Sequence, residues 1–358
     1  MSAVTSLPTF KPQFGVIVPT YNPGLDVWAK WVQALQLQNC KPMQVVVVDS
    51  GSTDGSLELS QQAGFKVLHT KAQDFNHGAT RQWALEQGFL NHQPNPANGA
   101  TPSATPSASS PPDFIVFLTQ DAILANPKAL EELLQAFQDP QVDAAYGRQL
   151  PNPEASWLET HTRAFNYPDV SRTVQLQDKA SLGIKACFLS NSFAAYRLQA
   201  LMAQGGFPAH LPLGEDTFTA AKFLLSGQSL SYQATAAVYH SHNYNGLQDF
   251  QRMFDTGVFH AQNLWILQNF GKAEGEGVKL VKSQWAYLRA PSSQSSQSSQ
   301  SNQSNQSNHP SLLQGVLQLL MTNAMKLVGY KLGRAHHWLP QVVVKKFAMN
   351  KVFWQPKK

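Results

Sequence analysis

One acid and two histidines, far apart in the sequence, have the chemistry of a divalent-metal site. The apolar run in FLTQDAI ends on a lone carboxylate, Asp121, and VYHSHNY carries His240 and His242. Residues at i and i+2 of an extended segment lie on one face, so both imidazoles can face one ion. Mg²⁺ keeps waters or ligand phosphates in its shell, so few protein ligands are needed. We expect Asp121 to bind the metal and His240 or His242 to complete the shell; ordinary packing of the histidines is the alternative.

A second group of acids has the chemistry of proton transfer. Glu215 and Asp216, in GEDTF, precede the apolar stretch TFTAAKFLLSG, which is typical of a helix. A carboxylate can take the proton of an attacking hydroxyl group, and a neighbouring acid can orient the acceptor or hold the first acid in place. Acids are also favoured in the first turn of a helix without any catalytic role. The two interpretations are compatible.

Asp49 follows a run of valines in VVVVDSGSTDG. An acid at the end of a buried strand can accept hydrogen bonds from a base N–H or a ribose hydroxyl. It could instead cap the next helix, although residues 52–55, Ser-Thr-Asp-Gly, suit that role better. Neither GxGxxG nor GxxxxGK[ST] occurs in the chain, so we expect no dinucleotide site and no ATP P-loop.

The stretch DFNHGATRQ, residues 74–82, places His77 and Gly78 where a helix starts. The amides of a helix N-terminus favour anionic groups. Arg81 lies four residues after His77 and therefore on the same helix face. We predict that His77, Gly78 and Arg81 lie beside a diphosphate or a sugar ring. The alternative is a helix capped by Asn76, with a solvated arginine.

Strand-like and helix-like stretches that could position these side chains alternate between residues 14 and 146. The predicted strands are FGVIVPT, QVVVVD, FKVLHT and DFIVFL, with helices at LDVWAKWVQALQLQ, SLELSQQAG and HGATRQWALEQGF. Short apolar strands joined by helices indicate a parallel sheet that is covered on both faces. Ligands bind outside the carboxyl ends of such strands. Those ends carry Thr20-Tyr21-Asn22, Asp49-Ser50 and Gln120-Asp121, which predicts one common site.

Low-complexity stretches divide the chain. We predict an N-terminal tail at 1–13, a main α/β domain at 14–290 with a disordered insertion at 93–112, a low-complexity linker at 291–309 and a C-terminal segment at 310–358. Residues 249–271 are predicted to form one helix. The C-terminal segment has helical apolar spacing, many lysines and no Asp or Glu. This pattern favours contact with a membrane surface over packing on the main domain.

Composition excludes several classes of protein. The 358 residues are 42% hydrophobic, which is enough for a large core. The net charge is +5. Two cysteines give no disulfide framework, so we expect reduced thiols. The N-terminus lacks the pattern of a signal peptide, and no apolar run is long enough to span a membrane. We therefore expect a cytoplasmic protein, peripheral at most on the inner face of the plasma membrane, with no nucleic-acid partner.

Seven motifs in order resemble one enzyme family. VIVPTYN, VVVVDSGSTDGS, DFNHGATRQ, FLTQDA, LSNSFAAYR, GEDTF and VYHSHNY follow one another as in the family 2 glycosyltransferases with the GT-A fold. The order is similar to the bacterial rhamnosyltransferase branch, which uses dTDP-rhamnose, and the resemblance covers roughly residues 14–270. It implies an α/β, Rossmann-like GT-A fold with a mostly parallel central sheet, flanking helices and, in this chain, a helical basic C-terminal extension.

The resemblance also implies roles for individual residues. Donor-binding positions of the family fall on Thr20, Tyr21, Asn22, Asp49, His77, Gly78, Arg81, Gln120 and Asp121. The first three would lie against the nucleoside and Asp49 against the pyrimidine base. Asp216 would be the base of an inverting transfer, with Glu215 beside it, and the cofactor would be Mg²⁺ or Mn²⁺. The chain departs from the family at two points: Ser50 stands in Asp-Ser-Gly-Ser where Asp is usual, and Thr119 replaces the first acid of Asp-x-Asp.

Together these features predict an inverting, metal-dependent transfer of a deoxysugar, most simply L-rhamnose from dTDP-rhamnose, to a surface-polysaccharide or lipid-linked glycan acceptor. Two alternatives stay open at this point: a UDP-hexose donor, and a catalytically inactive protein that binds a sugar nucleotide. A nucleotidyltransferase is disfavoured, because VPTYNPG lacks the Gly-rich loop with Arg and Lys that such enzymes need.

Overall fold

The computed structural model describes residues 10–91, 110–290 and 310–355. The predicted linker at 291–309, most of the predicted insertion at 93–112 and most of the N-terminal tail lie outside the described residues. The strands are β1 (Phe14–Thr20), β2 (Gln44–Asp49), β3 (Lys66–His69), β4 (Phe114–Leu118), β5 (Ile123–Leu124), β6 (Val142–Leu150), β7 (Arg172–Val174), β8 (Phe193–Arg197) and β9 (Ser229–Tyr239).

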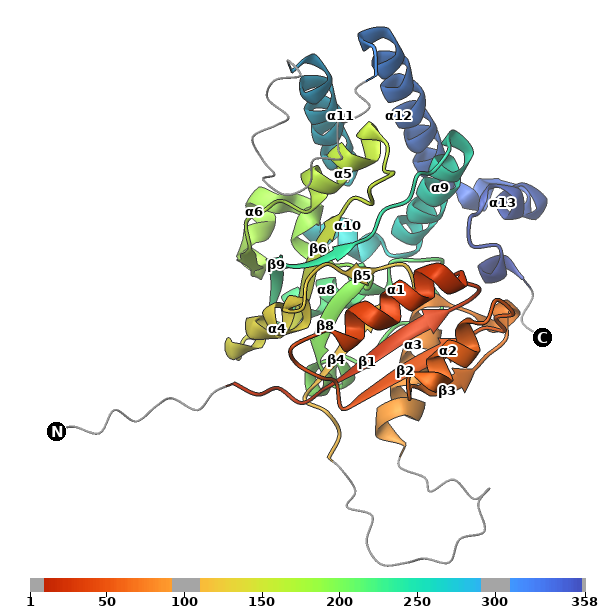
Figure 1. Ribbon diagram of the computed structural model, residues 1–358. Coiled ribbons are helices and arrows are strands. Elements are labelled where there is room, and N and C mark those ends of the chain that lie inside the picture. Colours follow the sequence, from red (N-terminus) through yellow and green to blue (C-terminus); the bar gives the residue numbers. More distant parts are fainter. Residues whose placement is uncertain (1–9, 92–109, 291–309, 356–358) are drawn as a thin grey trace, which may run out of the picture.

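Thirteen α-helices connect and cover these strands in the described parts of the chain (Figure 1). They are α1 (Leu25–Gln36), α2 (Ser56–Gln62), α3 (His77–Leu85), α4 (Ala129–Leu134), α5 (Trp157–Asn166), α6 (Lys179–Leu182), α7 (Leu198–Ala203), α8 (Glu215–Leu225), α9 (Gly246–Gln262), α10 (Leu264–Phe270), α11 (Glu274–Arg289), α12 (Leu312–Arg334) and α13 (Gln341–Phe347).

All strands form one mixed sheet in the order β3-β2-β1-β4-β8-β6-β9-β5, with β7 paired to β9. The strands β3, β2, β1 and β4 are parallel, as predicted from their alternation with helices. Beyond β4 the sheet is no longer purely parallel, because β8 pairs antiparallel with both β4 and β6. The α/β fold class is therefore confirmed, and the parallel character belongs to the N-terminal half of the sheet together with the β6–β9 pair.

Strand periodicity explains the two-sided core. Ile17 of β1 packs into the core on one face of the sheet, while Val16 and Val18 pack into the core on the other face. The valines of β2 alternate in the same way. Successive side chains of a strand point to opposite faces, so a continuously apolar strand requires helices on both sides. Helices α1 and α4 cover one face, and α3 and α8 cover the other.

The predicted single helix over 249–271 is instead two helices. Helix α9 begins earlier, at Gly246, where Asn245 and Gln248 form a capping box. It ends at Asn263, which has φ −124° and ψ 53° and whose side chain donates to the Phe259 carbonyl at 2.9 Å. A side-chain amide that bonds the backbone in this way competes with helix continuation, so α10 starts in a new direction.

The C-terminal segment packs on the main domain through α9 and α12. A Cβ atom added to Gly329 would lie 2.3 Å from the Phe250 carbonyl oxygen, and one added to Gly333 would lie 2.0 Å from that of Phe254. The two backbones therefore touch, which only glycine allows. One face of the segment is thus part of the enzyme body. None of the helices in the described parts combines the length and the apolar character that crossing a bilayer requires.

Candidate functional site

A cavity of about 990 Å³ lies at the carboxyl ends of β1 and β4, and residues of α9 also line it. Most of the predicted site residues line it: Thr20, Tyr21, His77, Arg81, Gln120, Asp121, Glu215, Asp216, His240 and His242. Three predicted residues, Asn22, Asp49 and Gly78, do not line it. The rest of the wall comes largely from the loop before β8, from α9 and from the turn that follows α13.

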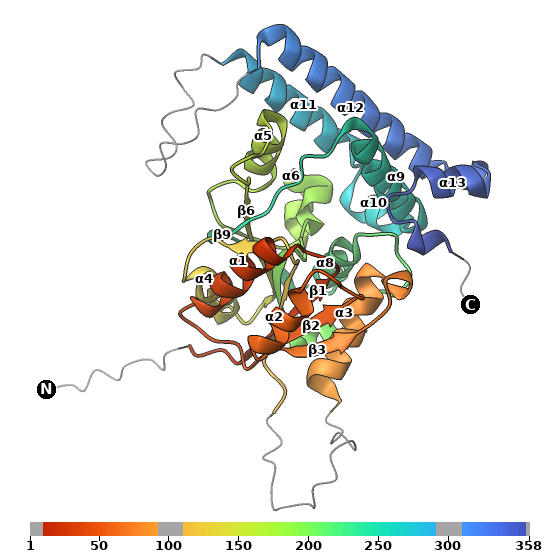
Figure 2. The same ribbon diagram turned by 45° about the vertical axis from the view of Figure 1, so that its right-hand side comes forward.

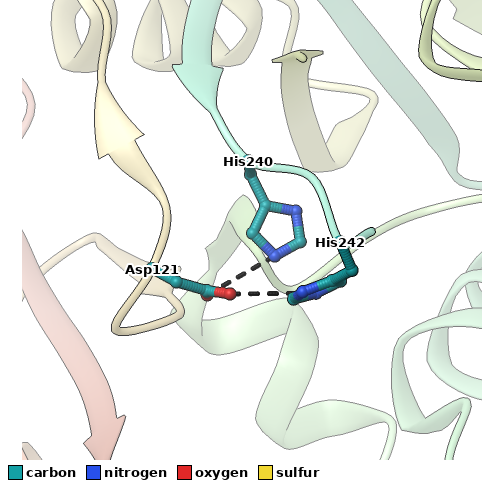
Figure 3. A group of neighbouring side chains, drawn as sticks. All are labelled: Asp121, His240 and His242. Atoms are coloured by element: carbon teal, nitrogen blue, oxygen red, sulfur yellow. Dashed lines mark ion pairs between the residues drawn. The ribbon is translucent and has the colours of Figure 1, made fainter. Parts of the chain in front are cut away.

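Asp121 meets His240 and His242 in this cavity although it is more than a hundred residues away from both in sequence (Figure 3). Asp121 Oδ1 lies 3.4 Å from His240 Nε2, and Asp121 Oδ2 lies 3.7 Å from His242 Nε2. Pairing of β5 with β9 brings the two segments together, because Ile123 is in register with Tyr239. One candidate ligand atom from each residue lies within 4.8 Å of the others. This group, here called the metal triad, fits a divalent transition metal.

The ionisation states of Asp121 and His242 also favour metal binding by the triad. Burial alone would raise the pKa of Asp121, but the hydrogen bond and charge of His240, with the charge of His242, outweigh it and lower that pKa. Burial, followed by the charge of His240, lowers the pKa of His242 to about 4. At neutral pH Asp121 is therefore ionised and the His242 imidazole is neutral. A carboxylate with two imidazole nitrogens suits Mn²⁺ better than Mg²⁺, which prefers a shell of oxygen atoms.

Gln149 of β6 fixes how His240 presents its ring. The Gln149 Oε1 atom accepts from the Arg163 guanidinium and lies 3.0 Å from His240 Nδ1, while Gln149 Nε2 donates to Ser190 Oγ at 3.0 Å. An arginine can only donate, so Oε1 must be the atom that faces His240. His240 Nδ1 therefore carries a proton, and Nε2 is the ring nitrogen that faces Asp121 and would bind a metal ion. Sequence spacing gives no signal for this role of Gln149.

We expect Gln149→Leu to weaken Mn²⁺ binding by about 10- to 100-fold, because the outer partner of a ligating histidine holds its tautomer and orientation. Isothermal titration of the metal-free protein with Mn²⁺ measures this directly. Gln149→Glu is the matched control, since it keeps an acceptor for His240 Nδ1–H and for Arg163, and it should bind Mn²⁺ close to wild type. Equal affinities of Gln149→Leu and wild type would refute the role.

Glu215 and Asp216 are the first two residues of α8, and the pKa values of their carboxyl groups shift in opposite directions. Glu215 Oε1 makes a salt bridge of 3.0 Å to Arg81 and accepts from the Asn191 side chain at 3.0 Å. Burial would raise the pKa of Glu215, but Arg81, His77 and Asn191 together lower it. Burial and then the Glu215 charge raise the pKa of Asp216 to about 6. Neighbouring acids with opposite shifts are typical of catalytic pairs.

Asn191 bridges the two acids and was not predicted as a site residue. Its backbone N–H donates to Asp216 Oδ2 at 3.2 Å, its side-chain nitrogen donates to Glu215, and its oxygen accepts from the Tyr196 hydroxyl at 2.7 Å. The residue lies in the LSNSFAAYR motif, which drew attention for its resemblance and not for this contact. A single buried amide therefore sets the positions of both carboxyl groups.

The start of α3 is capped by Asn76, the alternative that the sequence left open. Asn76 Oδ1 accepts from the amides of Gly78 and Ala79, so the cap takes two of the N–H groups expected to face an anion. Gly78 is needed for packing, because an added Cβ would lie 1.9 Å from the Pro208 carbonyl oxygen. Arg81 is buried, lines the cavity and pairs with Glu215, so it is not solvated, and its place beside a diphosphate or a sugar ring stays a prediction. His77 lines the cavity, and burial lowers its pKa to about 4 against the charge of Glu215.

Asp49 and Asn22 hold the loops at the nucleoside end. The Asp49 carboxylate accepts from the backbone N–H groups of Gly51 and Ser52 and from Thr20 Oγ1, and the residue is only 2% exposed. Asn22, in the left-handed region at φ 43°, accepts from the Thr53 amide and donates its own amide to Ser52 Oγ. These bonds join the loops after β1 and β2. The contact of Asp49 with a pyrimidine base stays a prediction.

Two other side chains complete the wall. Tyr21 is 53% exposed, and its amide donates to Gln120 Oε1 at 2.7 Å, which joins the ends of β1 and β4. Arg252 of α9 lines the cavity and makes no salt bridge with any acid among the described residues. Its charge nevertheless helps to lower the pKa of both His77 and His242, so it lies within electrostatic reach of both.

Comparisons with known proteins identify the family of the chain. Residues 12–254 match a family model described as "Glycosyltransferase like family 2". The chain is 41% identical over 347 residues to the O-antigen chain rhamnosyltransferase WbaN of Salmonella anatum, covering 96% of each chain. It is 39% identical over 344 residues to the O-antigen chain rhamnosyltransferase RfbN of Salmonella typhimurium, covering 95% of each.

A solved structure shares the fold. The mannosyltransferase PcManGT from Pyrobaculum calidifontis, in complex with GDP-Man and Mn²⁺, matches with a TM-score of 0.50 and 17% identity, over 97% of this chain and 86% of that one. The GT-A architecture expected from the motifs is confirmed. On the family model and the two full-length relatives, the chain belongs to the family 2 glycosyltransferases.

Proposed function

We propose that this glycosyltransferase transfers L-rhamnose from dTDP-L-rhamnose to a glycan acceptor of surface-polysaccharide synthesis, with inversion at the anomeric carbon. The relatives that cover nearly the whole chain are O-antigen chain rhamnosyltransferases, which supports the sugar and the class of acceptor. The observation that carries the mechanism is the carboxyl group of Asp216, which has its pKa raised to about 6 in the same cavity as the metal triad.

Asp216 is the proposed base. The acceptor hydroxyl attacks the anomeric carbon on the face opposite the diphosphate, its proton passes to the Asp216 carboxylate, and the bond from the anomeric carbon to the diphosphate oxygen breaks. A base with a pKa near the working pH is ionised and still binds the proton well. The negative charge of Glu215, held by Arg81, helps to keep Asp216 in that range.

The leaving diphosphate carries negative charge that must be neutralised. Asp121, His240 and His242 would hold Mn²⁺, and when bound this ion supplies positive charge to the diphosphate oxygens. Arg252, with no acidic partner among the described residues, offers a second cation from α9. At the other end of the cavity, the exposed ring of Tyr21 is available to stack on the base of the nucleotide.

The part of the cavity between Asp216 and the C-terminal helices has room for a large acceptor. The cavity continues from Asp216 toward Thr256 and His260 of α9, Glu276 at the start of α11, and Met349 and Val352 after α13. We assign this part to a lipid-linked glycan acceptor and place the enzyme in the cytoplasm at the inner face of the plasma membrane.

A panel of sugar nucleotides tests the proposal. The purified enzyme is incubated with dTDP-L-rhamnose, UDP-hexoses or GDP-mannose, with Mn²⁺ or with EDTA, and release of the nucleoside diphosphate is measured. We expect slow hydrolysis of dTDP-L-rhamnose alone, dependent on Mn²⁺. Turnover of a UDP-hexose in its place would support the rival donor. Donor binding without any release, in the presence of both metal and acceptor, would support an inactive binding protein.

A further inference from the structure

Helix α12 is apolar on two opposite faces, and only one of them is covered. Gly315, Leu319, Gly329, Tyr330 and Gly333 are buried on one side. The other side exposes a stripe of large apolar residues at helical spacing: Leu313, Leu317, Leu320, Met321, Leu327 and Val328, which are 49% to 81% exposed. A continuous apolar stripe on a surface helix marks an interaction site.

The neighbouring helix α11 carries positive charge and an aromatic side chain on its exposed surface. Figure 2 shows α11 and α12 side by side as its outermost layer, and Lys331 of α12 bonds Glu274 of α11 at 2.7 Å. The exposed arc of α11 contains Lys279, Lys282, Trp285 and Arg289, with the Arg289 guanidinium 5.8 Å from the Trp285 ring. The stripe on α12 and this arc on α11 are here called the outer helix face.

Charges around the outer helix face have one predominant sign. From residue 310 onward the chain has no Asp or Glu, while α13 carries Lys345 and Lys346. The acids at the start of α11 are already paired: Glu274 with Lys331, and Glu276 with Lys185 and Lys279. Apolar residues bordered by lysine, arginine and tryptophan are typical of helices that lie in the headgroup region of a bilayer.

We propose that the outer helix face docks on a membrane leaflet that contains anionic phospholipids. Charge complementarity selects this occupant. A symmetric contact between two copies would bring the same cations together, whereas anionic headgroups neutralise them while the leucines enter the acyl boundary. The helix pair stays peripheral, because α12 is fixed to α9 through the backbone contacts of Gly329 and Gly333.

Docking places the catalytic cavity beside the leaflet. The start of α11 and the turn after α13 contribute Glu276, Met349 and Val352 to the acceptor half of the cavity. Both segments adjoin the outer helix face. The glycan of an acceptor would therefore reach Asp216 while its lipid stays in the leaflet. This consequence rests on the proposed function, whereas the docking itself does not depend on which sugar is transferred.

Co-sedimentation of the full-length protein with vesicles tests the inference. Vesicles of phosphatidylcholine alone are compared with vesicles that also contain phosphatidylglycerol. We expect strong binding only to the mixed vesicles, reduced by added salt because headgroup attraction is screened. The triple variant Leu313→Ser/Leu317→Ser/Leu320→Ser should lose at least about tenfold in vesicle affinity. Lys282→Gln/Arg289→Gln should weaken binding to the mixed vesicles and its salt dependence.

A matched control changes exposed apolar residues elsewhere. Leu37, Val170 and Leu225 are 60%, 69% and 38% exposed and lie away from the outer helix face. The variant Leu37→Ser/Val170→Ser/Leu225→Ser should sediment like wild type. Both triple variants should hydrolyse donor in solution at the wild-type rate, which separates docking from the transfer chemistry.

Three results would overturn the inference. One is wild-type protein that stays in the supernatant with the mixed vesicles. Another is a leucine variant that sediments as fully as wild type. The third is a wild-type dimer in solution that becomes a monomer in the leucine variant, which would make the outer helix face a contact between copies.

Discussion

Asp216→Asn is expected to reduce rhamnosyl transfer by roughly 10²- to 10⁴-fold, the range that a positioned general base contributes. The amide has nearly the same shape as the carboxylate but cannot take the acceptor proton. The Asn191 amide donates to Oδ2 and the Thr217 amide to Oδ1, so one of these two hydrogen bonds persists at the remaining oxygen, and we expect the fold to be preserved. Single-turnover transfer measured at saturating donor and acceptor checks this. Activity within a few-fold of wild type would refute the assignment.

The pH profile gives the same base an independent signature. Because the pKa of Asp216 is raised to about 6, kcat/KM should increase as the pH rises through about 6 and level off above it. Below that pH the carboxyl group is protonated and cannot accept a proton.

Glu215→Gln separates the two acids. It removes a negative charge that helps to raise the pKa of Asp216, so the inflection should move to lower pH. The variant leaves Arg81 without its carboxylate and should also be less stable, so its rates must be referred to the folded fraction. An inflection that stays in place or rises would contradict the proposed coupling.

Asp121→Ala is expected to abolish both Mn²⁺ binding and transfer. The change removes the one carboxylate of the metal triad and leaves two imidazoles, which hold the ion and its diphosphate ligand weakly. Isothermal titration with Mn²⁺ and the transfer assay measure the two losses separately.

Thr119→Ala is the matched control for Asp121→Ala. Thr119 stands where other families have a first acid, and as a neutral hydroxyl it should contribute little, so transfer should fall only modestly. Wild-type transfer that continues unchanged in EDTA would contradict the role of Asp121, as would an Asp121→Ala variant that binds Mn²⁺ with wild-type affinity.

Runs of apolar residues in the sequence predicted the parallel strands in the N-terminal half of the sheet. Valine-rich runs such as residues 45–48 indicated strands buried on both faces, and the polar residues after them fall at one edge, where Thr20 and Asp121 line a common cavity. The antiparallel half of the sheet was not predicted, because β8 joins β4 and β6 through pairings that no local period encodes.

Side-chain partners were the part of the site hardest to predict. Spacing placed Arg81 on the face of His77, but its partner is Glu215, 134 positions away and brought near by the packing of α3 on α8. Gln149 carries no motif, and its role depends on three neighbours from other segments. Sequence also suggested that the C-terminal segment stands apart, whereas Gly329 and Gly333 pack it closely on α9.

The anomeric configuration of the product tests the central claim most directly. Wild-type enzyme is incubated with dTDP-L-rhamnose, Mn²⁺ and a lipid-linked acceptor, and the new glycosidic bond is assigned by NMR. We expect rhamnose attached with the configuration opposite to that of the donor, because Asp216 activates the acceptor for one direct displacement. A product that retains the donor configuration would contradict it.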